Sequence, residues 1–381
     1  MGRGLVFEHD YIVGGPARAP VTPNFRLAEY ASASGRVRVH RELVAAVQML
    51  RSDLGRRVSI DGITPRGGVG RGLDGRFVWV KADSPADLAA SAARVARDGW
   101  LARVESRGDA LYIEMPDPQN LPPLLAERAL DLAIEVTAAF ETSGDPYQQV
   151  TGNFDGAGLS FGPLQVNLGT GTLQELCRRY AARDEARLSE CFGDLWPQWQ
   201  GMLRLRSRAQ QVRWADALSR GSRKAGFDAG WTAALQRVGR DTVFRAETLR
   251  YAYDTYGRKL IVALAWLKGV RPVILRNFRC LAALYDLCVQ QGSLDRAHTA
   301  IRRRIEREDP RDEFALTRIA VEERGRAANA QWRADCISRR LCILEREPVR
   351  VVESGVSAQR DNPQLHLLRN APVKQMERYL A

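Results

Sequence analysis

The sequence lacks several features that would narrow its function at once. Only five of its 57 basic residues are lysine, and only four residues are histidine. No apolar run is long enough for a signal peptide or a membrane span, and the best one, LIVALAWL at 260–267, has the length of a core helix. We therefore expect a chain that is synthesised in the cytoplasm without a signal peptide and does not insert stably into a membrane.

The cysteines and histidines form no ligand set that the sequence reveals. There is no C-x-x-C and no repeated cysteine spacing, so zinc ribbons and redox dithiols are unsupported. No two histidines have the spacing of metal ligands. We expect neither a metal nor an organic cofactor.

The charge is strongly positive, with a net charge of +12 and a pI of about 9.8. Nearly all of the excess is arginine, and two explanations stay open: the coding bias of a GC-rich genome, or attraction to a polyanion such as a nucleic acid, a membrane surface or an anionic wall polymer. No basic run is interleaved with aromatics as in a nucleic-acid-binding module. We expect no nucleic-acid partner.

A length of 381 residues favours more than one domain. Residues 1–22 are rich in Gly and Pro and indicate an extended arm, and 23–115 show mixed helix and strand patterns. MPDPQNLPP at 115–123, with four prolines, is the best linker. Residues 116–381 are mainly helical, with one β-like interruption at 147–166 and an irregular C-terminal end. The predicted fold class is α+β: a mainly α-helical domain with a small β-hairpin sheet, preceded by a small α+β domain.

Within the first domain the patterns predict two helices and several strands. Gly55 should end the first helix, and a hairpin should turn at Gly108-Asp109. The expected helices are 41–54 and 86–99, and the expected strands are 57–63, 75–82 and the two arms of 102–115.

Glu141 lies at the end of the first helix of the second domain. Ile134, Thr137 and Glu141 fall on one helical face with Leu130, and this face is otherwise apolar. A carboxyl group held there in a half-apolar pocket would have a raised pKa, which suits a general acid.

Asp155 is the complementary carboxylate. It is followed by Gly156 and Gly158, which allow a tight turn and a close approach of backbone to a substrate. In a solvated hairpin Asp155 should stay ionised, and two carboxyl groups in unlike environments suit glycoside hydrolysis. From spacing alone, a surface Glu and an ordinary Asp-Gly turn remain an alternative.

The stretch DGAGLSFGPLQVNLGTGTLQEL, at 155–176, resembles the hairpin of the family 46 chitosanases, which belong to the lysozyme superfamily. FRAETLRYAY and ALYDLCVQQG resemble helical stretches of that family, so the resemblance covers about 120–300. It implies that Glu141 is the general acid, Asp155 the base and Ser160 the hydroxyl that holds the attacking water, with inversion at the anomeric carbon. Tyr147, Gln165 and Asn167 are candidate substrate-binding residues; the last two alternate along the strand after Ser160 and should share one face.

Two departures bear on the substrate. The segment between Glu141 and Asp155 is shorter than is usual in chitosanases, and a basic chain should repel the polycation chitosan. We therefore expect a muramidase-like enzyme that cleaves the glycan strand of peptidoglycan. The alternatives are a chitosanase and a non-catalytic protein that binds the cell wall.

A wall hydrolase without a signal peptide would reach the periplasm or wall of a target cell after delivery. It would be a type VI secretion effector, with a cognate immunity protein and a delivery partner, or a phage lysin or tail enzyme.

The first domain resembles the zinc D-Ala-D-Ala carboxypeptidases of the Hedgehog-like fold, without their metal ligands. Gly72 stands at the position of the first His ligand and Trp79 at that of the Asp. The final His position falls near Tyr112. The resemblance thus implies a degenerate, metal-free domain.

Overall fold

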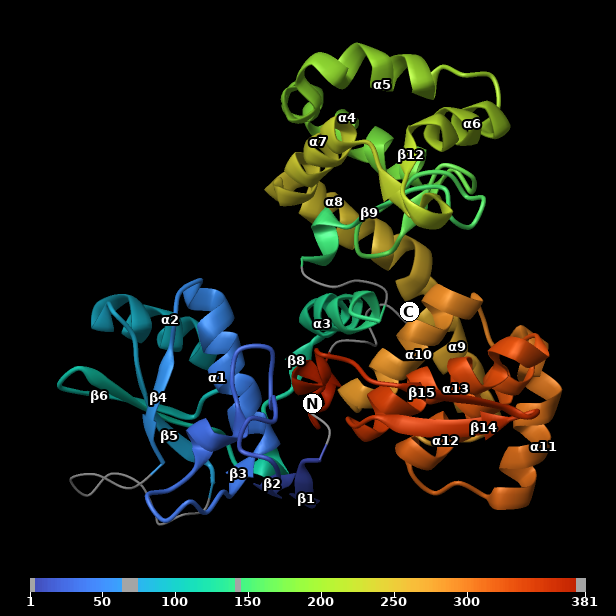
Figure 1. Cartoon of the computed structure of the whole chain (residues 1–381). Helices are drawn as coiled ribbons and strands as arrows, with labels where there is room; N and C mark the ends of the chain where they lie inside the picture. Colours follow the sequence, from blue (N-terminus) through green and yellow to red (C-terminus); the bar gives the residue numbers. More distant parts are fainter. Residues whose placement is uncertain (1–3, 64–74, 141–144, 375–381) are drawn as a thin grey trace. The chain divides into compact units, whose positions relative to one another are not determined.

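The computed structural model describes residues 4–63, 75–140 and 145–374 (Figure 1). The chain divides into two compact units. Unit 1 comprises residues 1–132, 263–284 and 294–381, and unit 2 comprises 133–262 and 285–293. The C-terminal segment thus belongs with the N-terminal part, and the domain boundaries expected from the proline-rich linker stay a prediction.

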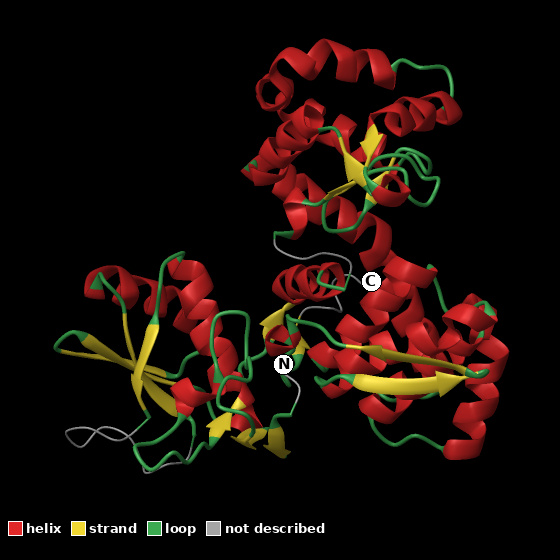
Figure 2. Cartoon of the chain, viewed as in Figure 1, coloured by secondary structure: helices red, strands yellow, loops and turns green. Residues whose placement is uncertain are grey.

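Helices predominate and the sheets are small (Figure 2), which confirms the predicted α+β class. None of the helices in the described part of the chain combines the length and apolar character needed to cross a membrane.

Unit 1 begins with two antiparallel sheets. The first has the order β1-β2-β3 and the second, of four strands, the order β4-β5-β7-β6. Helix α1 packs on α2, and α2 packs on β6 and β7. The bounds are β1 Val6–Glu8, β2 Tyr11–Gly14, β3 Val39–His40, α1 Arg41–Leu54, β4 Ser59–Gly62, β5 Phe77–Lys81, α2 Pro85–Arg97, β6 Arg103–Arg107 and β7 Ala110–Glu114.

The helix ends follow local chemistry. The imidazole of His40 accepts a hydrogen bond from the Glu42 amide at the start of α1, and Gly55 ends the helix with a φ of 66°. The hydroxyl of Ser84 accepts from the Asp87 amide at the start of α2. Both predicted helices and the hairpin of β6 and β7 are confirmed.

The C-terminal part of unit 1 is a helical layer with one hairpin. Strands β8 and β16 pair in parallel, and the β14–β15 hairpin packs on α13. The bounds are β8 Leu124–Leu125, α11 His298–Glu308, α12 Glu313–Arg326, α13 Ala330–Glu345, β14 Val349–Glu353, β15 Val356–Arg360 and β16 Val373–Lys374.

The expectation of an irregular C-terminal end is wrong for residues 349–360. These residues form the β14–β15 hairpin, which turns at Ser354 and Gly355 with φ values of 53° and 77°. Positive φ at both central residues is the geometry of a two-residue hairpin turn, usually signalled by Asn-Gly or Asp-Gly. Ser-Gly is a weaker signal, and both strands are only half-buried, so the alternation of apolar residues is faint.

Unit 2 surrounds a three-stranded sheet with helices. The bounds are β9 Val150–Thr151, β10 Ser160–Phe161, β11 Val166–Asn167, α4 Thr172–Phe192, α5 Trp196–Leu203, α6 Arg208–Leu218, β12 Ser219–Arg220, β13 Gly226–Phe227, α7 Ala229–Arg240 and α8 Thr242–Ala252. Three helices have residues in both units: α3 Ala126–Ala138, α9 Arg258–Val270 and α10 Phe278–Gln291.

A buried carboxylate joins the two ends of unit 1. The side chain of Glu42 is 2% exposed, and those of Arg346 and Arg369 are fully buried. Glu42 Oε1 lies 3.0 Å from Arg346 Nη1, and Glu42 Oε2 lies 3.3 Å from Arg369 Nε. Burial lowers the pKa of Arg369, and the charge of Glu42 opposes that shift. A second nitrogen of Arg369 donates to the Gly99 carbonyl, so one cluster connects α1, the end of α2 and the C-terminal segment.

We predict that Glu42→Gln lowers the free energy of unfolding of the chain by about 3–5 kcal/mol, because two buried guanidinium groups lose their counter-charge. The matched control is Glu8→Gln, whose pair with Arg38 is largely exposed and should contribute less than about 1 kcal/mol. Chemical denaturation followed by circular dichroism measures both. Equal losses for the two variants would contradict a central role for Glu42.

Candidate active site

The small sheet of unit 2 has one polar and one apolar face. Strand β10 lies between β9 and β11, and Ser160 is directly opposite both Thr151 and Asn167. Residues opposite each other in antiparallel strands project to the same side, so these three polar side chains form a row. Phe161 projects to the other side, where its ring lies 5.3 Å from that of Phe244 in α8. The apolar face packs the sheet against α8, and the polar row lies on the opposite face of the sheet.

Ser160 is in the centre of this row. The residue is 4% exposed, and its hydroxyl makes no hydrogen bond to any residue that the structure describes. The hydroxyl oxygen itself is not fully buried, so solvent reaches it, and a water molecule is a suitable partner.

Asp155 lies in the loop between β9 and β10 and is exposed. Its Oδ1 accepts a hydrogen bond of 3.0 Å from the Ala157 amide, which fixes the direction of the carboxylate. Gly156 and Gly158 have φ values of 85° and 81°, so the turn that presents Asp155 depends on glycine. Within the described ranges no Lys, Arg or His pairs with this carboxylate.

Asn153 fixes the loop from within. Its Oδ1 accepts from the Gly158 amide at 2.8 Å, and its Nδ2 donates to Asp216 Oδ1 at 2.7 Å. Its backbone amide donates to Ser219 Oγ at 2.9 Å. The side chain thus closes the loop on itself and attaches it to α6.

The backbone of residues 224–226 approaches Gly152 very closely. A Cβ on Gly152 would lie 2.3 Å from the Gly226 carbonyl oxygen and 2.4 Å from that of Lys224. Lys224 also donates to Asp216 Oδ2 at 2.6 Å. That hydrogen bond, together with the one from Asn153, lowers the pKa of Asp216 and keeps its carboxylate ionised as an acceptor.

The geometric premise for Gln165 is wrong. Gln165 precedes β11 and has a φ of 47°, so it is not extended and does not alternate with Asn167. Its side chain accepts from Thr151 Oγ1 at 3.3 Å and donates to the Gly162 carbonyl at 3.0 Å. Gln165 and Asn167 are both half-exposed, and their role in substrate binding stays a prediction.

Asn167 does lie on the face of Ser160, and it also shapes the next turn. Its Oδ1 accepts from the amide and the hydroxyl of Thr170, each at 2.9 Å. Its backbone amide donates to Thr172 Oγ1. The polar row therefore ends in the turn that begins α4.

Tyr147 is 8% exposed, and the guanidinium of Arg245 lies 4.6 Å from the centre of its ring. Arg245 is itself paired with Asp145 at 2.6 Å. The ring is packed rather than displayed, and a contact of Tyr147 with substrate stays a prediction.

Glu141 lies outside the residues that the structure describes. The helix that leads to it, α3, ends at Ala138, and Ile134 and Thr137 are buried as the helical face predicts. Its role as general acid is therefore a proposal that rests on the sequence.

Several known structures are similar to this chain, whereas no protein-family model and no curated protein matches it. The native chitosanase of Bacillus subtilis MY002 aligns over 62% of this chain and 100% of its own, with 16% identity and a TM-score of 0.37. A family 46 chitosanase of Gynuella sunshinyii, in complex with chitotetraose, aligns over 62% and 98%, with 17% identity and a TM-score of 0.40. Another chitosanase complex aligns over 61% and 96%, with 19% identity and a TM-score of 0.37.

The similarity to chitosanases expected from residues 155–176 thus has a counterpart among solved structures, whereas none of the chitosanase structures named here supports the carboxypeptidase resemblance of the first domain. Because the identities and TM-scores are low, we base the function on the residues of this chain.

Two of the three positions equated with zinc ligands carry aromatic rings in this chain. Trp79 and Tyr112 lie opposite each other on β5 and β7, with ring centres 5.3 Å apart, and each is 1% exposed. Gly72 lies outside the described residues. Across the ranges described, no group of three or more His, Cys, Asp or Glu side chains could hold a metal ion.

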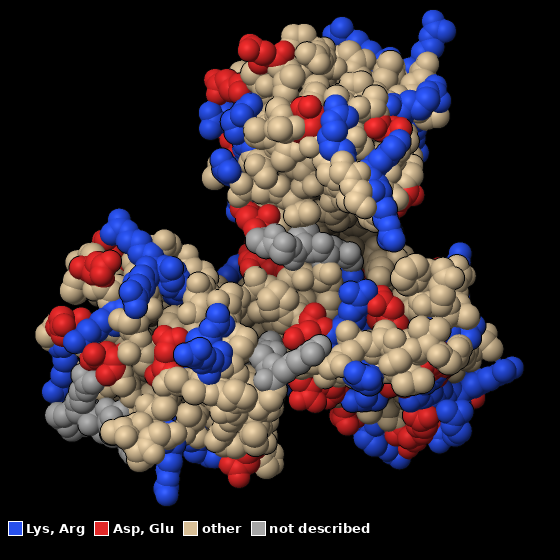
Figure 3. Space-filling view, in the orientation of Figure 1, with Lys and Arg blue, Asp and Glu red and all other residues tan. Residues whose placement is uncertain are grey.

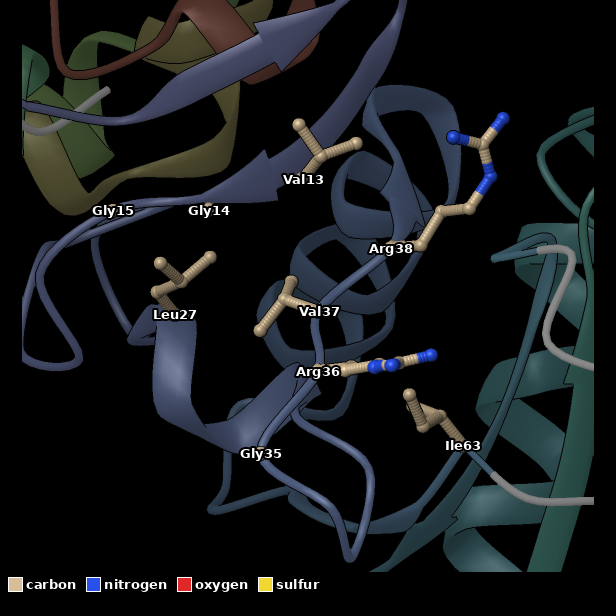
Figure 4. Close-up of a pocket in the computed structure, with 9 residues that line it drawn as sticks. All are labelled: Val13, Gly14, Gly15, Leu27, Gly35, Arg36, Val37, Arg38 and Ile63. Carbon is tan, nitrogen blue, oxygen red and sulfur yellow. The ribbon is translucent and has the colours of Figure 1, made fainter.

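Unit 1 contains a pocket of about 500 Å³ near β2 (Figure 4). Its walls include Val13, Leu27, Val37 and Ile63, and Arg36 extends toward Ile63. None of the predicted catalytic residues lines it. The pocket is therefore separate from the chemistry predicted for unit 2.

Sequence reasoning missed two residues of this site, Thr151 and Asn153. The Val-Thr alternation of β9 was a signal for Thr151, but two residues are too few to fix a strand. Nothing in the sequence near Asn153 points to its partners, which lie 63 and 66 residues further along the chain.

We predict that Asn153→Ala lowers turnover about 10- to 100-fold in a folded protein, because the Asp155 loop loses two side-chain hydrogen bonds. Hydrogen exchange of the loop should quicken, since the Gly158 amide loses its acceptor. Gln210→Ala is the control, because that amide accepts from the Ser207 backbone instead. Unchanged exchange over 152–160 in Asn153→Ala would contradict the role given to Asn153.

Proposed function

We propose that this chain is a glycoside hydrolase with a lysozyme-like fold that cleaves the glycan strand of peptidoglycan. The observation that carries the proposal is the exposed Asp155 carboxylate, held on a fixed glycine loop next to the strand of Ser160, whose hydroxyl has no hydrogen-bond partner among the described residues and is reached by solvent. An exposed loop is normally free to vary its shape, and fixing a carboxylate there suits chemistry.

In the proposed reaction Glu141 donates its proton to the glycosidic oxygen as the bond to the anomeric carbon breaks. Asp155 takes a proton from a water molecule, whose oxygen forms the new bond on the opposite face of the sugar ring. Ser160 holds that water through its hydroxyl. The configuration at the anomeric carbon inverts, and no cofactor takes part.

Charge separates the two candidate substrates. Chitosan is a polycation and is repelled by a chain with a net charge of +12, whereas peptidoglycan carries carboxylates on its peptide stems. The enzyme would then act in the periplasm or wall of a target cell, and a cognate immunity protein would protect the producer. A secretion system or a phage tail would supply the delivery partner.

We predict that Glu141→Gln lowers turnover on its glycan about 10²- to 10⁴-fold with the fold retained, because the leaving oxygen loses its proton donor. Asp155→Asn should be comparably damaging, since the water loses its base. Ser160→Ala should cost roughly ten- to a hundredfold, as expected for one hydrogen bond to a positioned water. Release of soluble fragments from purified sacculi measures all three.

The matched controls are Glu185→Gln and Asp194→Asn, which neutralise exposed carboxylates elsewhere in unit 2. They should retain nearly full turnover. A folded Glu141→Gln variant that degrades sacculi like the wild type would end the glycosidase proposal.

We also predict release of fragments from sacculi and little from highly deacetylated chitosan, with mass spectrometry of the products identifying the bond cleaved. Cleavage of chitosan with intact sacculi would instead favour the chitosanase alternative. Binding to sacculi without cleavage of either polymer would favour a non-catalytic wall-binding protein.

A further inference from the structure

Unit 2 is nearly neutral as a whole, although the chain is strongly basic. It holds 17 Lys and Arg residues against 15 Asp and Glu residues. Residues 203–224, however, contain seven basic residues and a single acidic one, Asp216. The charge of this unit is therefore concentrated in one segment, which comprises the end of α5, helix α6, strand β12 and the turn after it.

Most arginines outside this segment are neutralised. Along α4, Arg179 pairs with Asp254 at 2.7 Å, Arg183 with Glu247 at 3.0 Å and Arg187 with Asp241 at 2.9 Å. In contrast, six arginines of the segment are exposed and pair with no carboxylate in the part of the chain that the structure describes. We call these six the arginine strip: Arg204, Arg206, Arg208, Arg213, Arg220 and Arg223.

The arginine strip adjoins the Asp155 loop. Val212, next to Arg213, lies 3.3 Å from the position a Cβ on Gly158 would occupy. The guanidinium of Arg208 lies about as close to Gly171, in the turn that follows Asn167, with its Nη2 2.9 Å from the corresponding Cβ position. Figure 3 shows basic side chains gathered over the part of unit 2 where α6 and β12 lie in Figure 1. A substrate at Asp155 would therefore lie beside unneutralised positive charge.

We propose that the arginine strip binds the carboxylates of the peptide stems next to the cleaved bond, so that the substrate is a glycan strand with acidic substituents. The proposal rests on the function proposed above and names the substrate class of that site. A guanidinium group presents paired N–H donors that match a carboxylate, and six such groups in one segment suit a polymer with repeated carboxylates.

The features of a nucleic-acid site are weaker here. Proteins that bind single strands combine positive charge with exposed aromatic rings on which bases stack. The one aromatic residue of the segment, Trp214, packs against Trp199, Trp231 and Phe227 instead. The segment itself therefore offers charge without a stacking surface, although the ring of Phe154 in the adjoining Asp155 loop is 55% exposed.

The test compares two triple variants that remove the same charge from unit 2. One is Arg206→Gln with Arg208→Gln and Arg213→Gln, within the strip. The control is Arg178→Gln with Arg258→Gln and Lys259→Gln, which neutralises exposed basic residues outside it. Thermal unfolding confirms that both remain folded. KM and kcat on sacculi are measured for each, and binding to sacculi, chitin beads and a single-stranded oligonucleotide is measured in an Asp155→Asn background.

We predict that the strip variant raises KM on sacculi, and weakens binding to them, about tenfold at low salt, with kcat nearly unchanged. The difference should vanish at about 0.5 M salt, because exposed charges are then screened. Binding to neutral chitin should not change, and the control variant should stay within about twofold of the wild type.

Equal effects of the two triple variants would overturn the proposal. Tighter binding to the oligonucleotide than to sacculi, with the same dependence on the strip, would overturn it in favour of a nucleic-acid partner. If the strip variant hydrolyses sacculi with the KM of the wild type, the proposed role of the arginine strip is wrong, and the proposed enzymatic activity stands. If the wild type binds sacculi through the strip but does not hydrolyse them, the binding role of the strip is supported, and the proposed hydrolase activity is wrong.

Discussion

Glu42 has almost no access to water, and two arginines from the C-terminal segment neutralise it. Neither partner can be removed cheaply, because a buried charge without its counter-charge costs far more than an exposed one. The arrangement forces the chain to close on itself: α1 needs Arg346 and Arg369, and these need the carboxylate on α1. Unit 1 is therefore a single folded unit built from both ends of the sequence, and the two segments of unit 2, 133–262 and 285–293, interrupt it.

The same principle of mutual dependence operates on a smaller scale in unit 2. Phe154 in the Asp155 loop is 55% exposed, and hydrogen bonds together with close backbone contacts define the shape of the loop. Asn153 satisfies the Gly158 amide inside the loop and the Asp216 carboxylate outside it. Gly152 permits the backbone of the β12–β13 turn to approach. An exposed carboxylate thereby keeps a fixed position without being buried.

The net charge of each surface of unit 2 depends on which arginines pair with carboxylates as much as on how many arginines there are. Arginines of α4 pair with carboxylates from α8 and from the residues directly before and after it, so that side of unit 2 has little net charge to offer. The arginines on and around α6 have no such partners among the described residues, and they lie beside the predicted site. A net charge of +12 would not distinguish these two surfaces, and only the second can attract an acidic polymer.

The sequence by itself determined the elements whose signals are local. Gly55 ended the first helix, the Gly-Asp turn placed the β6–β7 hairpin, and Asp-Gly-Ala-Gly indicated the loop of Asp155. The tertiary structure decided what depends on distant partners. Glu42 pairs with two arginines that are 304 and 327 residues away in the sequence, and Asn153 bonds to a residue of α6 that is 63 residues away. The sequence also did not predict the hairpin at 349–360 or the conformation of Gln165. Each depends on a positive φ, at Ser354 and at Gln165, that these residue types rarely adopt. Local propensity acts within a few residues, whereas the pairing of buried charges and hydrogen bonds is settled only when the whole chain has packed.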